Sequence, residues 1–310
     1  MKPIVILGIF VADTAYRAER QPKMGETILG QSFTLGPGGK GSNQAVAAAM
    51  ARSAAGGEVH FITRLGRDDF AAIARATWAR AGVVPQVTED AESYTGAAYI
   101  FLEAATGNNA IIVSPGAAAR ISAADVEARA ELIAGAAAFV TQLEQPIPAA
   151  LRGLQIARAA GVATILNPAP AAALSDEMLA LCDFVTPNET EAEALTGIAV
   201  TDLASAERAA DALLARGVGA VIVTLGDKGA LYHDAGRTVH VPVISAGPVV
   251  ETTGAGDAFN GGFAVALSEG RDVIEAVRFG CATAGISVTR AGTAPAMPTR
   301  AEIDALLARV

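Results

Sequence analysis

A single carboxylate stands directly behind three small residues in the stretch ETTGAGDAFNGG, residues 251–262. Gly254, Ala255 and Gly256 let the backbone turn sharply and let another molecule approach its N–H groups. The apolar residues after Asp257 have the spacing of one buried helical face, so we expect these four residues to form the first turn of a helix. The free N–H groups and the dipole of such a turn attract anions. The alternative is a glycine turn in which Asp257 only caps the helix.

A second glycine-rich stretch, GPGGKG at residues 36–41, fits the pattern G-x-G-x-x-G. It follows a polar segment and not the first expected strand, so it is a poor dinucleotide-binding fingerprint. Lys40 precedes a glycine where a P-loop needs Ser or Thr. Lys40 and Asn43 are polar groups at the start of an otherwise small, apolar helix, where they could hold a hydroxylated ligand. A flexible turn before that helix is the alternative.

Two more stretches follow expected strands. In TPNETEAEALTG, Asn188 and Glu191 lie one helical turn apart, so their side chains can meet. This pair suits hydrated Mg²⁺ and phosphate, or it is an ordinary acidic helix start. TLGDKGA, residues 224–230, follows a strand at a place where open α/β sheets bind ligands, although a hairpin turn would look the same.

Short β-branched runs alternate with alanine-rich helical runs along the whole chain. Most of the β-branched runs are apolar throughout, as expected for strands that are covered on both faces. The alternation predicts one three-layer α/β/α sandwich over residues 1–310, with a mostly parallel sheet. Between the strands, residues 201–217 predict a helix that Thr201 caps and Gly217 ends. The expected strands are residues 4–10, 59–63, 138–143, 162–167, 183–188 and 220–226.

Two segments interrupt this alternation. Residues 14–37 are polar, and residues 94–114 have the pattern of a hairpin that turns near residues 106–109. Neither segment can form a β-α-β unit. We therefore expect the two segments to form a small separate β-sheet, such as a lid.

The composition excludes several classes of protein. A net charge of −9 and a pI of about 4.9 are poor for binding nucleic acid. The two cysteines form no CxxC or Cys/His cluster, so neither a disulfide framework nor a zinc site is expected. The apolar N-terminus is typical of a buried first strand, and no stretch approaches an uninterrupted membrane span of about 20 residues. We expect a soluble, cytoplasmic protein without a membrane partner.

Seven motifs occur in order along the chain and together resemble the ribokinase-like carbohydrate kinases over nearly its whole length. Two of them, GGKGSNQ and GAGDAFNGG, are specific to that family. The other five are LGRDDF, QLEQP, LNPAPA, TPNETEAEALTG and TLGDKG. The resemblance implies a ribokinase-like fold with a β-sheet lid, and phosphoryl transfer from ATP to a sugar hydroxyl with Mg²⁺.

The resemblance also assigns catalytic roles. Asp257 matches the base that takes the proton of the attacking sugar hydroxymethyl group. Gly254, Ala255 and Gly256 match an anion hole, whose N–H groups stabilise the charge on the transferring phosphoryl group. A carboxylate directly behind small residues at a helix start is therefore what this chemistry needs.

Binding residues follow from the same resemblance. The implied sugar contacts are Asp13, Gly39, Lys40, Asn43, Glu144 and Asp257. The implied nucleotide contacts are Asn188, Thr224, Leu225, Gly226, Asp227, Lys228, Gly229, Gly256 and Cys281, although Cys281 stands where the family has a polar residue. Asn188 and Glu191 match an element that holds Mg²⁺ through water. An implied monovalent-cation site for K⁺ consists of Glu251, Thr253, Ser287, Arg290, Gly292 and Ala296.

Three further positions depart from the ribokinase pattern. Glu251 replaces an Asp and Ala296 replaces a Ser at the expected cation site. Val11 replaces an Asn two residues before Asp13, and valine cannot form a hydrogen bond with a sugar hydroxyl.

The substrate therefore has several candidates. D-Ribose, converted to D-ribose 5-phosphate, is the first expectation. A kinase for fructose, 2-keto-3-deoxygluconate or a nucleoside is the alternative. A non-catalytic sugar- or nucleotide-binding regulator on the same fold is a hypothesis of a different class. We also expect a homodimer that forms through the lid.

Overall fold

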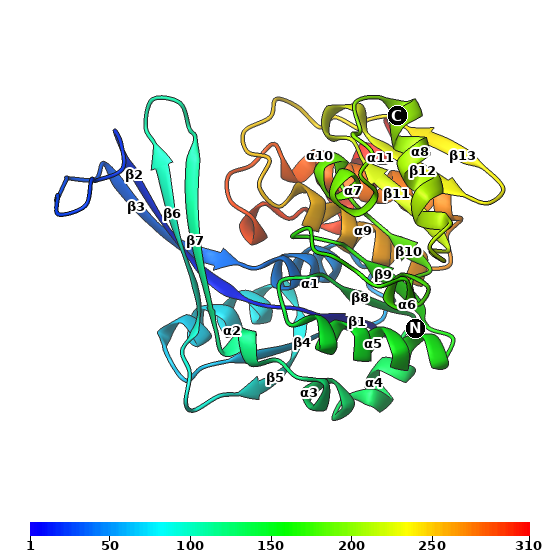
Figure 1. The fold of residues 1–310 in the computed structure, drawn as a ribbon, viewed down its shortest axis with the longest axis horizontal. Coiled ribbons are helices and arrows are strands. Elements are labelled where there is room, and N and C mark those ends of the chain that lie inside the picture. The colour runs from blue at the N-terminus through cyan, green and yellow to red at the C-terminus, as the bar shows by residue number, and fades with distance from the viewer.

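A nine-stranded sheet runs through the centre of the protein in the computed structural model, which describes residues 1–310 (Figure 1). Neighbouring strands are parallel from β11 to β5, and β12 and β13 extend one edge in antiparallel fashion. In spatial order the strands are β13 (Thr238–Val241), β12 (Ala230–Asp234), β11 (Ala220–Thr224), β10 (Phe184–Val185), β9 (Ala163–Leu166), β8 (Ala138–Thr141), β1 (Ile4–Leu7), β4 (Val59–Leu65) and β5 (Val83–Glu89).

Helices cover both faces of this sheet. None of these helices is both long and apolar enough to cross a membrane. One face carries α1 (Lys40–Ala51), α2 (Asp69–Ala81), α9 (Ala255–Ser268), α10 (Val273–Ser287) and α11 (Arg300–Leu307). The other carries α3 (Ala123–Glu127), α4 (Ala130–Ala134), α5 (Ile147–Ala159), α6 (Asp176–Leu179), α7 (Glu189–Thr196) and α8 (Leu203–Leu214).

The central strand β1 shows how the two cores form. Ile4 and Ile6 belong to the hydrophobic core under α1 and α9, whereas Val5 and Leu7 belong to the core under α5 and α8. Successive side chains of a strand point to opposite faces, so a strand that is covered on both sides must be apolar throughout. The predicted three-layer α/β/α sandwich is confirmed.

All six strands expected from the sequence lie in the large sheet, but most end before the expected segment does. β8, β9 and β10 give way to loops that carry polar residues at the carboxyl edge of the sheet, where α/β folds bind ligands.

The cap predicted for α8 is wrong. Asp202 is the N-cap and accepts a hydrogen bond of 2.7 Å from the backbone of Ser205. The Thr201 N–H instead donates to the Ser205 hydroxyl. The helix ends at Leu214, before Gly217.

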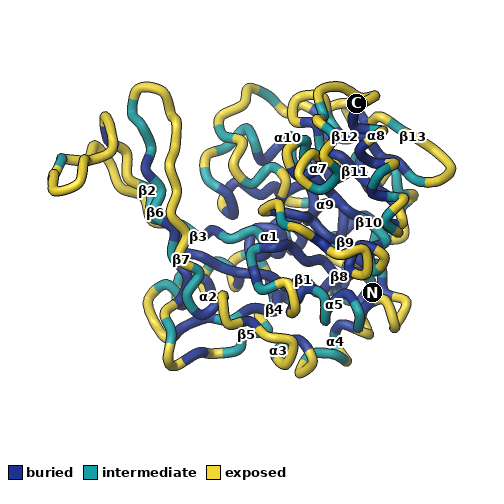
Figure 2. Tube along the Cα trace, in the orientation of Figure 1, coloured by how far each residue is buried: buried dark blue, intermediate teal, exposed yellow.

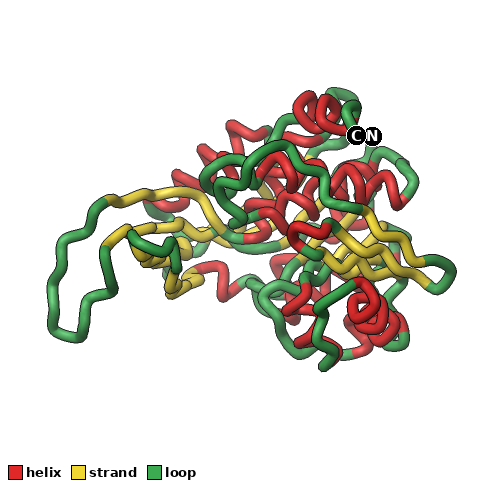
Figure 3. Tube along the Cα trace, turned by 90° about the horizontal axis from the view of Figure 1, so that it is seen from above, coloured by secondary structure: helices red, strands yellow, loops and turns green.

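A small separate sheet stands away from this body, as predicted (Figure 1). Its strands, in spatial order, are β3 (Ser32–Gly38), β2 (Val11–Ala18), β6 (Thr95–Glu103) and β7 (Asn109–Gly116). The sheet begins at Val11, so Asp13 lies on it and not on the large sheet. Its outer end is exposed (Figure 2), and it extends to one side of the body when seen from above (Figure 3).

Candidate active site

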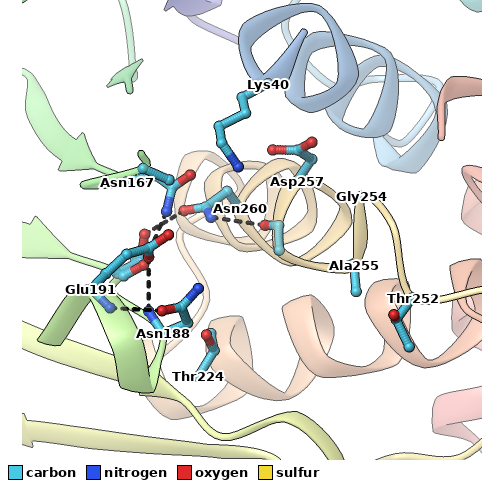
Figure 4. Close-up of a pocket in the computed structure, with 13 residues that line it drawn as sticks. Lys40, Asn167, Asn188, Glu191, Thr224, Thr252, Gly254, Ala255, Asp257 and Asn260 are labelled. Atoms are coloured by element: carbon cyan, nitrogen blue, oxygen red, sulfur yellow. Dashed lines mark hydrogen bonds between the residues drawn. The ribbon is translucent and has the colours of Figure 1, made fainter. Parts of the chain in front are cut away.

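The first turn of α9 forms one wall of a polar pocket at the carboxyl edge of the large sheet (Figure 4). Gly254 is the N-cap with φ 80°, a left-handed conformation that glycine adopts without strain. No side chain caps the helix. The Ala255 N–H donates to the Thr252 carbonyl over 3.1 Å, whereas the N–H groups of Gly254 and Gly256 make no hydrogen bond within the chain and remain available to an anion. The pocket is lined by Lys40, Asn167, Ala169, Thr186, Asn188, Glu191, Thr224, Thr252, Gly254, Ala255, Gly256, Asp257 and Asn260.

Asp257 contacts α1 and does not cap its own helix. Its Oδ2 accepts a hydrogen bond of 3.0 Å from Asn43 Nδ2, and its Oδ1 accepts one of 3.1 Å from Gln44 Nε2. Burial raises the pKa of Asp257, while the charge of Lys40 and the two amide donors partly offset this effect. The capping interpretation is therefore wrong, because this carboxylate is held across the site by another helix.

Lys40, the first residue of α1, connects two groups of polar residues. Its side chain extends into the pocket between Asn167 and Asp257 (Figure 4), and its backbone N–H donates to Glu144 Oε2 over 2.7 Å. Burial lowers the pKa of Lys40, but the carboxylates of Asp257, Glu144 and Glu191 outweigh that effect and raise it overall. Lys40 therefore stays charged beside the open helix start.

The predicted sugar-binding carboxylates Asp13, Glu144 and Asp257 lie near Lys40, because the charges of Lys40, Asp257 and Asp13 all act on Glu144. Burial raises the pKa of Asp13 to about 6, and this carboxylate makes no hydrogen bond within the chain. Burial also raises the pKa of Glu144 to about 7, against the opposing effect of Lys40. The Asn43 Oδ1 is buried without a partner. These acceptors are suited to hydroxyl donors, since buried polar atoms require partners.

Gly39 lets the start of α1 approach the backbone that follows β1 closely. A Cβ atom at this position would lie 2.6 Å from the carbonyl oxygen of Ile9, and the residue has φ 89°. Only glycine fits both conditions. The residue therefore acts through the backbone, by placing Lys40 and Asn43 in the site.

Asn188 and Glu191 form a reciprocal cap at the start of α7. The Asn188 N–H donates to Glu191 Oε2 over 2.9 Å, and the Glu191 N–H donates to Asn188 Oδ1 over 2.8 Å. Both residues line the pocket, and no cluster of three His, Cys, Asp or Glu could bind a metal directly. The second carboxylate oxygen of Glu191 is left to accept from a metal-bound water, so the pair fits Mg²⁺ held through water.

The expected nucleotide residues are only partly brought together. Thr224, at the end of β11, lines the pocket and forms a bridge with Asn188. Residues 225–229 lie outside the pocket lining; Leu225 is buried in the core, and Lys228 Nζ donates to the carbonyl of Thr201. They form a tight connection, Gly226–Lys228, between the antiparallel strands β11 and β12. The turn is thus also the hairpin that the sequence allowed.

Cys281 also lies outside the pocket lining. It is buried on α10, within the hydrophobic core, and burial raises the pKa of its thiol to about 12. The thiol is therefore neutral and makes no hydrogen bond within the chain.

The side chains of the expected monovalent-cation site are largely engaged within the protein. Glu251 Oε2 accepts a hydrogen bond of 2.7 Å from the backbone of Gly292, and the Ser287 hydroxyl donates to a backbone carbonyl. Arg290 forms an ion pair with Glu302, and Ala296 has no side-chain ligand. Backbone carbonyls would have to supply most of the ligands for a cation here.

The sequence analysis missed the pocket-lining residues Ala169 and Thr252, and it missed a group of four polar residues: Gln44, Asn167, Thr186 and Asn260. These four are buried and are linked by hydrogen bonds, for example from Thr186 Oγ1 to Asn260 Oδ1 over 2.7 Å. Asn260 Nδ2 also donates to the Gly256 carbonyl over 2.8 Å. Each lies inside one of the seven motifs, and the signal was a polar side chain within an otherwise apolar strand end or helix start.

Comparisons with known proteins agree with this geometry. The model of the pfkB family of carbohydrate kinases matches residues 1–300. Ribokinase of Haemophilus influenzae is 39% identical over 302 residues, 97% of each chain, and deoxyribokinase of Salmonella typhi is 36% identical over 96% of this chain and 95% of that protein. The structure of Arabidopsis thaliana ribokinase with ribose and ATP superposes with a TM-score of 0.92 at 32% identity, covering 99% and 98% of the two chains. The chain therefore belongs to the pfkB family of carbohydrate kinases and is a phosphotransferase that acts on a sugar hydroxyl.

Proposed function

We propose that the protein transfers the γ-phosphoryl group of ATP to D-ribose and forms D-ribose 5-phosphate and ADP. The observation that carries this proposal is the buried Asp257 carboxylate in the uncapped first turn of α9, with the Lys40 side chain lining the same pocket. One pocket therefore contains both a carboxylate that can act as a base, Asp257, and a helix start that can bind an anion. Ribose is the preferred sugar because several relatives are named ribokinase.

Each residue then has a chemical task. Asp13, Asn43 and Glu144 accept hydrogen bonds from the sugar hydroxyls. Asp257 accepts the proton of the primary hydroxyl as that oxygen attacks phosphorus. The N–H groups of Gly254 and Gly256, at the turn that Ala255 completes, and the Lys40 ammonium stabilise the negative charge that spreads over the transferring phosphoryl oxygens.

The phosphate groups of ATP would lie along the pocket from the start of α9 towards Asn188 and Thr224. Asn188 and Glu191 would hold Mg²⁺ through water, and the ion would neutralise phosphate charge. Residues 225–229 and Cys281 would lie beside the rest of the nucleotide.

A monovalent cation, K⁺, would lie behind the anion hole, where the Glu251 side chain accepts a hydrogen bond from the backbone of Gly292. We expect K⁺ to activate turnover by stabilising this loop. Rates measured with and without K⁺ at constant ionic strength test the idea, and equal rates would remove the cation site from the proposal.

The small sheet would act as a lid within a single α/β unit of 310 residues, formed by the insertions at residues 14–37 and 94–114. The position of Asp13 supports this role, because the carboxylate that we propose binds the sugar lies on strand β2 of that sheet. Closure of the sheet over the sugar would exclude water and favour transfer to the sugar over ATP hydrolysis.

Deoxyribose is a second candidate substrate, and Val11 favours it. Val11 shares a strand face with Asp13 and is 4% exposed, so a sugar hydroxyl that pointed at it would have no partner. A sugar without that hydroxyl would avoid this cost. Coupled measurement of ADP release with ribose, deoxyribose, fructose, 2-keto-3-deoxygluconate and nucleosides separates these candidates, and no turnover with any sugar would favour a binding regulator.

Asp257→Asn tests the mechanism directly. The amide keeps the size of the side chain but cannot take a proton, so kcat should fall about 10²–10⁴-fold. The variant removes a buried charge but places an NH₂ group against one of the two amide donors, and rotation of the Asn43 amide can present its unpaired oxygen to that group. The melting temperature should therefore stay close to that of the wild type. ATP affinity is the control and should remain close to wild type. An Asp257→Asn enzyme with normal kcat would overturn the proposed mechanism.

A further inference from the structure

The side chain of Gln44 forms hydrogen bonds with the proposed base and with residues from two other parts of the fold. It projects from α1 and is fully buried. Its Nε2 donates to Asp257 Oδ1 and to Asn167 Oδ1, each over 3.1 Å, and its Oε1 accepts from Gln142 Nε2 over 2.6 Å. Asp257 lies on α9, while Asn167 and Gln142 follow β9 and β8.

The direction of these hydrogen bonds follows from the chemistry of the partners. A carboxylate only accepts, so Gln44 must present its NH₂ group to Asp257. The Gln44 carbonyl then faces Gln142, which must donate. Asn167 has the matching orientation, because its own NH₂ group donates to the Thr186 carbonyl over 3.1 Å. A flipped Gln44 amide would set its oxygen against the oxygens of Asp257 and Asn167.

Gln44 differs from its neighbour Asn43 in one respect. Asn43 donates to the other oxygen of Asp257, but its Oδ1 is buried without a partner and is free to accept from a sugar hydroxyl. In Gln44 both N–H groups and the carbonyl oxygen are already bonded, and none of its surface is exposed. Gln44 therefore cannot contact the substrate.

We propose that Gln44 is a positioning residue for Asp257: it fixes the plane of the carboxylate and holds it in the charged form that accepts the sugar proton. This inference rests on the proposed role of Asp257 as the base. A hydrogen bond from an amide stabilises a carboxylate more than a neutral carboxyl. Burial has the opposite effect, and the charge of Lys40 and the two amide donors together oppose it, so the Gln44 donor is one of the groups that keep the base charged.

Loss of the Gln44 donor should move the acid limb of the pH profile. Gln44→Met keeps the shape of the side chain but cannot donate, so the pKa of Asp257 rises and kcat/KM falls at low pH. We expect the limb to shift upward by about one pH unit. Lys40, Glu144 and Glu191 are the charged groups that face Asp257, and they are the same in both proteins.

Gln145→Met is the matched control. Gln145 is also a buried amide; it donates to the Thr141 hydroxyl and to the Gln142 carbonyl, and it has no bond to Asp257. The same chemical change at this position should lower stability but leave the acid limb at its wild-type pH. A purely structural role for Gln44 predicts the same behaviour in both variants, and that result would overturn the proposal.

Two further measurements keep the test decisive. If Gln44→Met does not fold, the double variant Gln44→Met with Gln142→Met removes the donor left unpaired on Gln142 and should show the same shift. If the titration of ATP hides the limb, infrared difference spectra against Asp257→Asn follow protonation of the Asp257 carboxyl directly. An unchanged midpoint in Gln44→Met refutes the role of Gln44 alone, whereas normal turnover in Asp257→Asn refutes the base itself.

Discussion

Two of the proposed sugar-binding residues, Asp13 and Glu144, have carboxyl groups whose pKa values are shifted by burial. Burial raises the pKa of Asp13 to about 6 and that of Glu144 to about 7. A carboxyl whose pKa is raised by folding stabilises the folded state most when it is protonated. Its contribution is therefore full below the unfolded pKa and is lost as the pH rises through the folded value.

Glu144→Gln should remove this pH dependence. For Glu144 the window extends from the usual value of 4.5 to about 7. Near pH 4 the variant should be about as stable as wild type, because both side chains are neutral. Near pH 8 the free energy of unfolding should be higher in the variant by about 1–3 kcal/mol. Urea denaturation of the ligand-free protein at the two pH values measures this, and a stability difference independent of pH would contradict it.

Val11→Asn should change the choice of sugar. The new amide supplies a donor and an acceptor beside Asp13, so kcat/KM for ribose should rise about tenfold, which corresponds to one hydrogen bond of about 1.4 kcal/mol. The value for deoxyribose should change little. Val11→Thr, similar in shape to valine but with one hydroxyl, is the intermediate control. If Val11→Asn lowers ribose turnover while another sugar is the better substrate of the wild type, ribose should be dropped.

At the scale of single elements, the start of α9 is the proposed anion-binding turn, and its two glycines differ. Gly254 has φ 80° and forms the turn into the helix. Gly256 lies within the helix without a positive φ, and a Cβ atom there would have no neighbour within 4 Å. Position 254 therefore requires glycine because another residue would be strained there. At position 256 a side chain would cause no backbone strain, and its only effect would be to fill the space in front of the N–H groups.

Alanine substitutions should separate these two roles. Gly254→Ala should destabilise the fold by about 1–2 kcal/mol, because alanine is strained in the left-handed region. Gly256→Ala should stabilise it by about 0.5–1 kcal/mol, as alanine does within a helix, yet lower kcat because the methyl group occupies space needed by the phosphoryl group. Denaturation curves and kcat are measured for both. Unchanged kcat in Gly256→Ala would remove Gly256 from the anion hole.

At the scale of the whole molecule, the small sheet leaves one apolar face uncovered. Tyr16, Phe33, Leu35 and Ile112 are 42%, 55%, 41% and 65% exposed. The strand registers place these side chains on the face opposite Asp13, and the tilted rings of Tyr16 and Phe33 have centroids 5.0 Å apart. Exposed apolar patches of this kind commonly mark an interface.

The proposed homodimer would cover this face with the same face of a second copy. Ile112→Lys should then convert the dimer to a monomer, because burial of an unpaired charge is unfavourable. Leu203→Lys, at a similarly exposed apolar residue of α8, is the control and should leave the dimer intact. Light scattering after size exclusion, over a range of concentrations, measures the mass. A wild-type protein that is monomeric throughout would refute the proposal.

Several features of the protein could be predicted from local sequence alone. The apolar, β-branched runs indicated a sheet covered on both faces, and the glycines before Asp257 indicated the start of a helix. These features depend on neighbouring residues, because side-chain periodicity and glycine conformation act over one or two turns of chain. The two segments that interrupt the β-α-β alternation, one polar and one with the pattern of a hairpin, likewise indicated a separate small sheet.

Only the tertiary structure decided which polar groups meet. Gln44 and Asp257 are 213 residues apart in the chain, and Gln44 and Asn167 are 123 apart, so no local pattern could pair them. The raised pKa of Glu144 is equally non-local, since it arises from burial by several elements and from the position of Lys40. Capping by Asp257 was plausible from its position in the helix; it was excluded because packing of α1 against α9 brings two amide donors to the carboxylate.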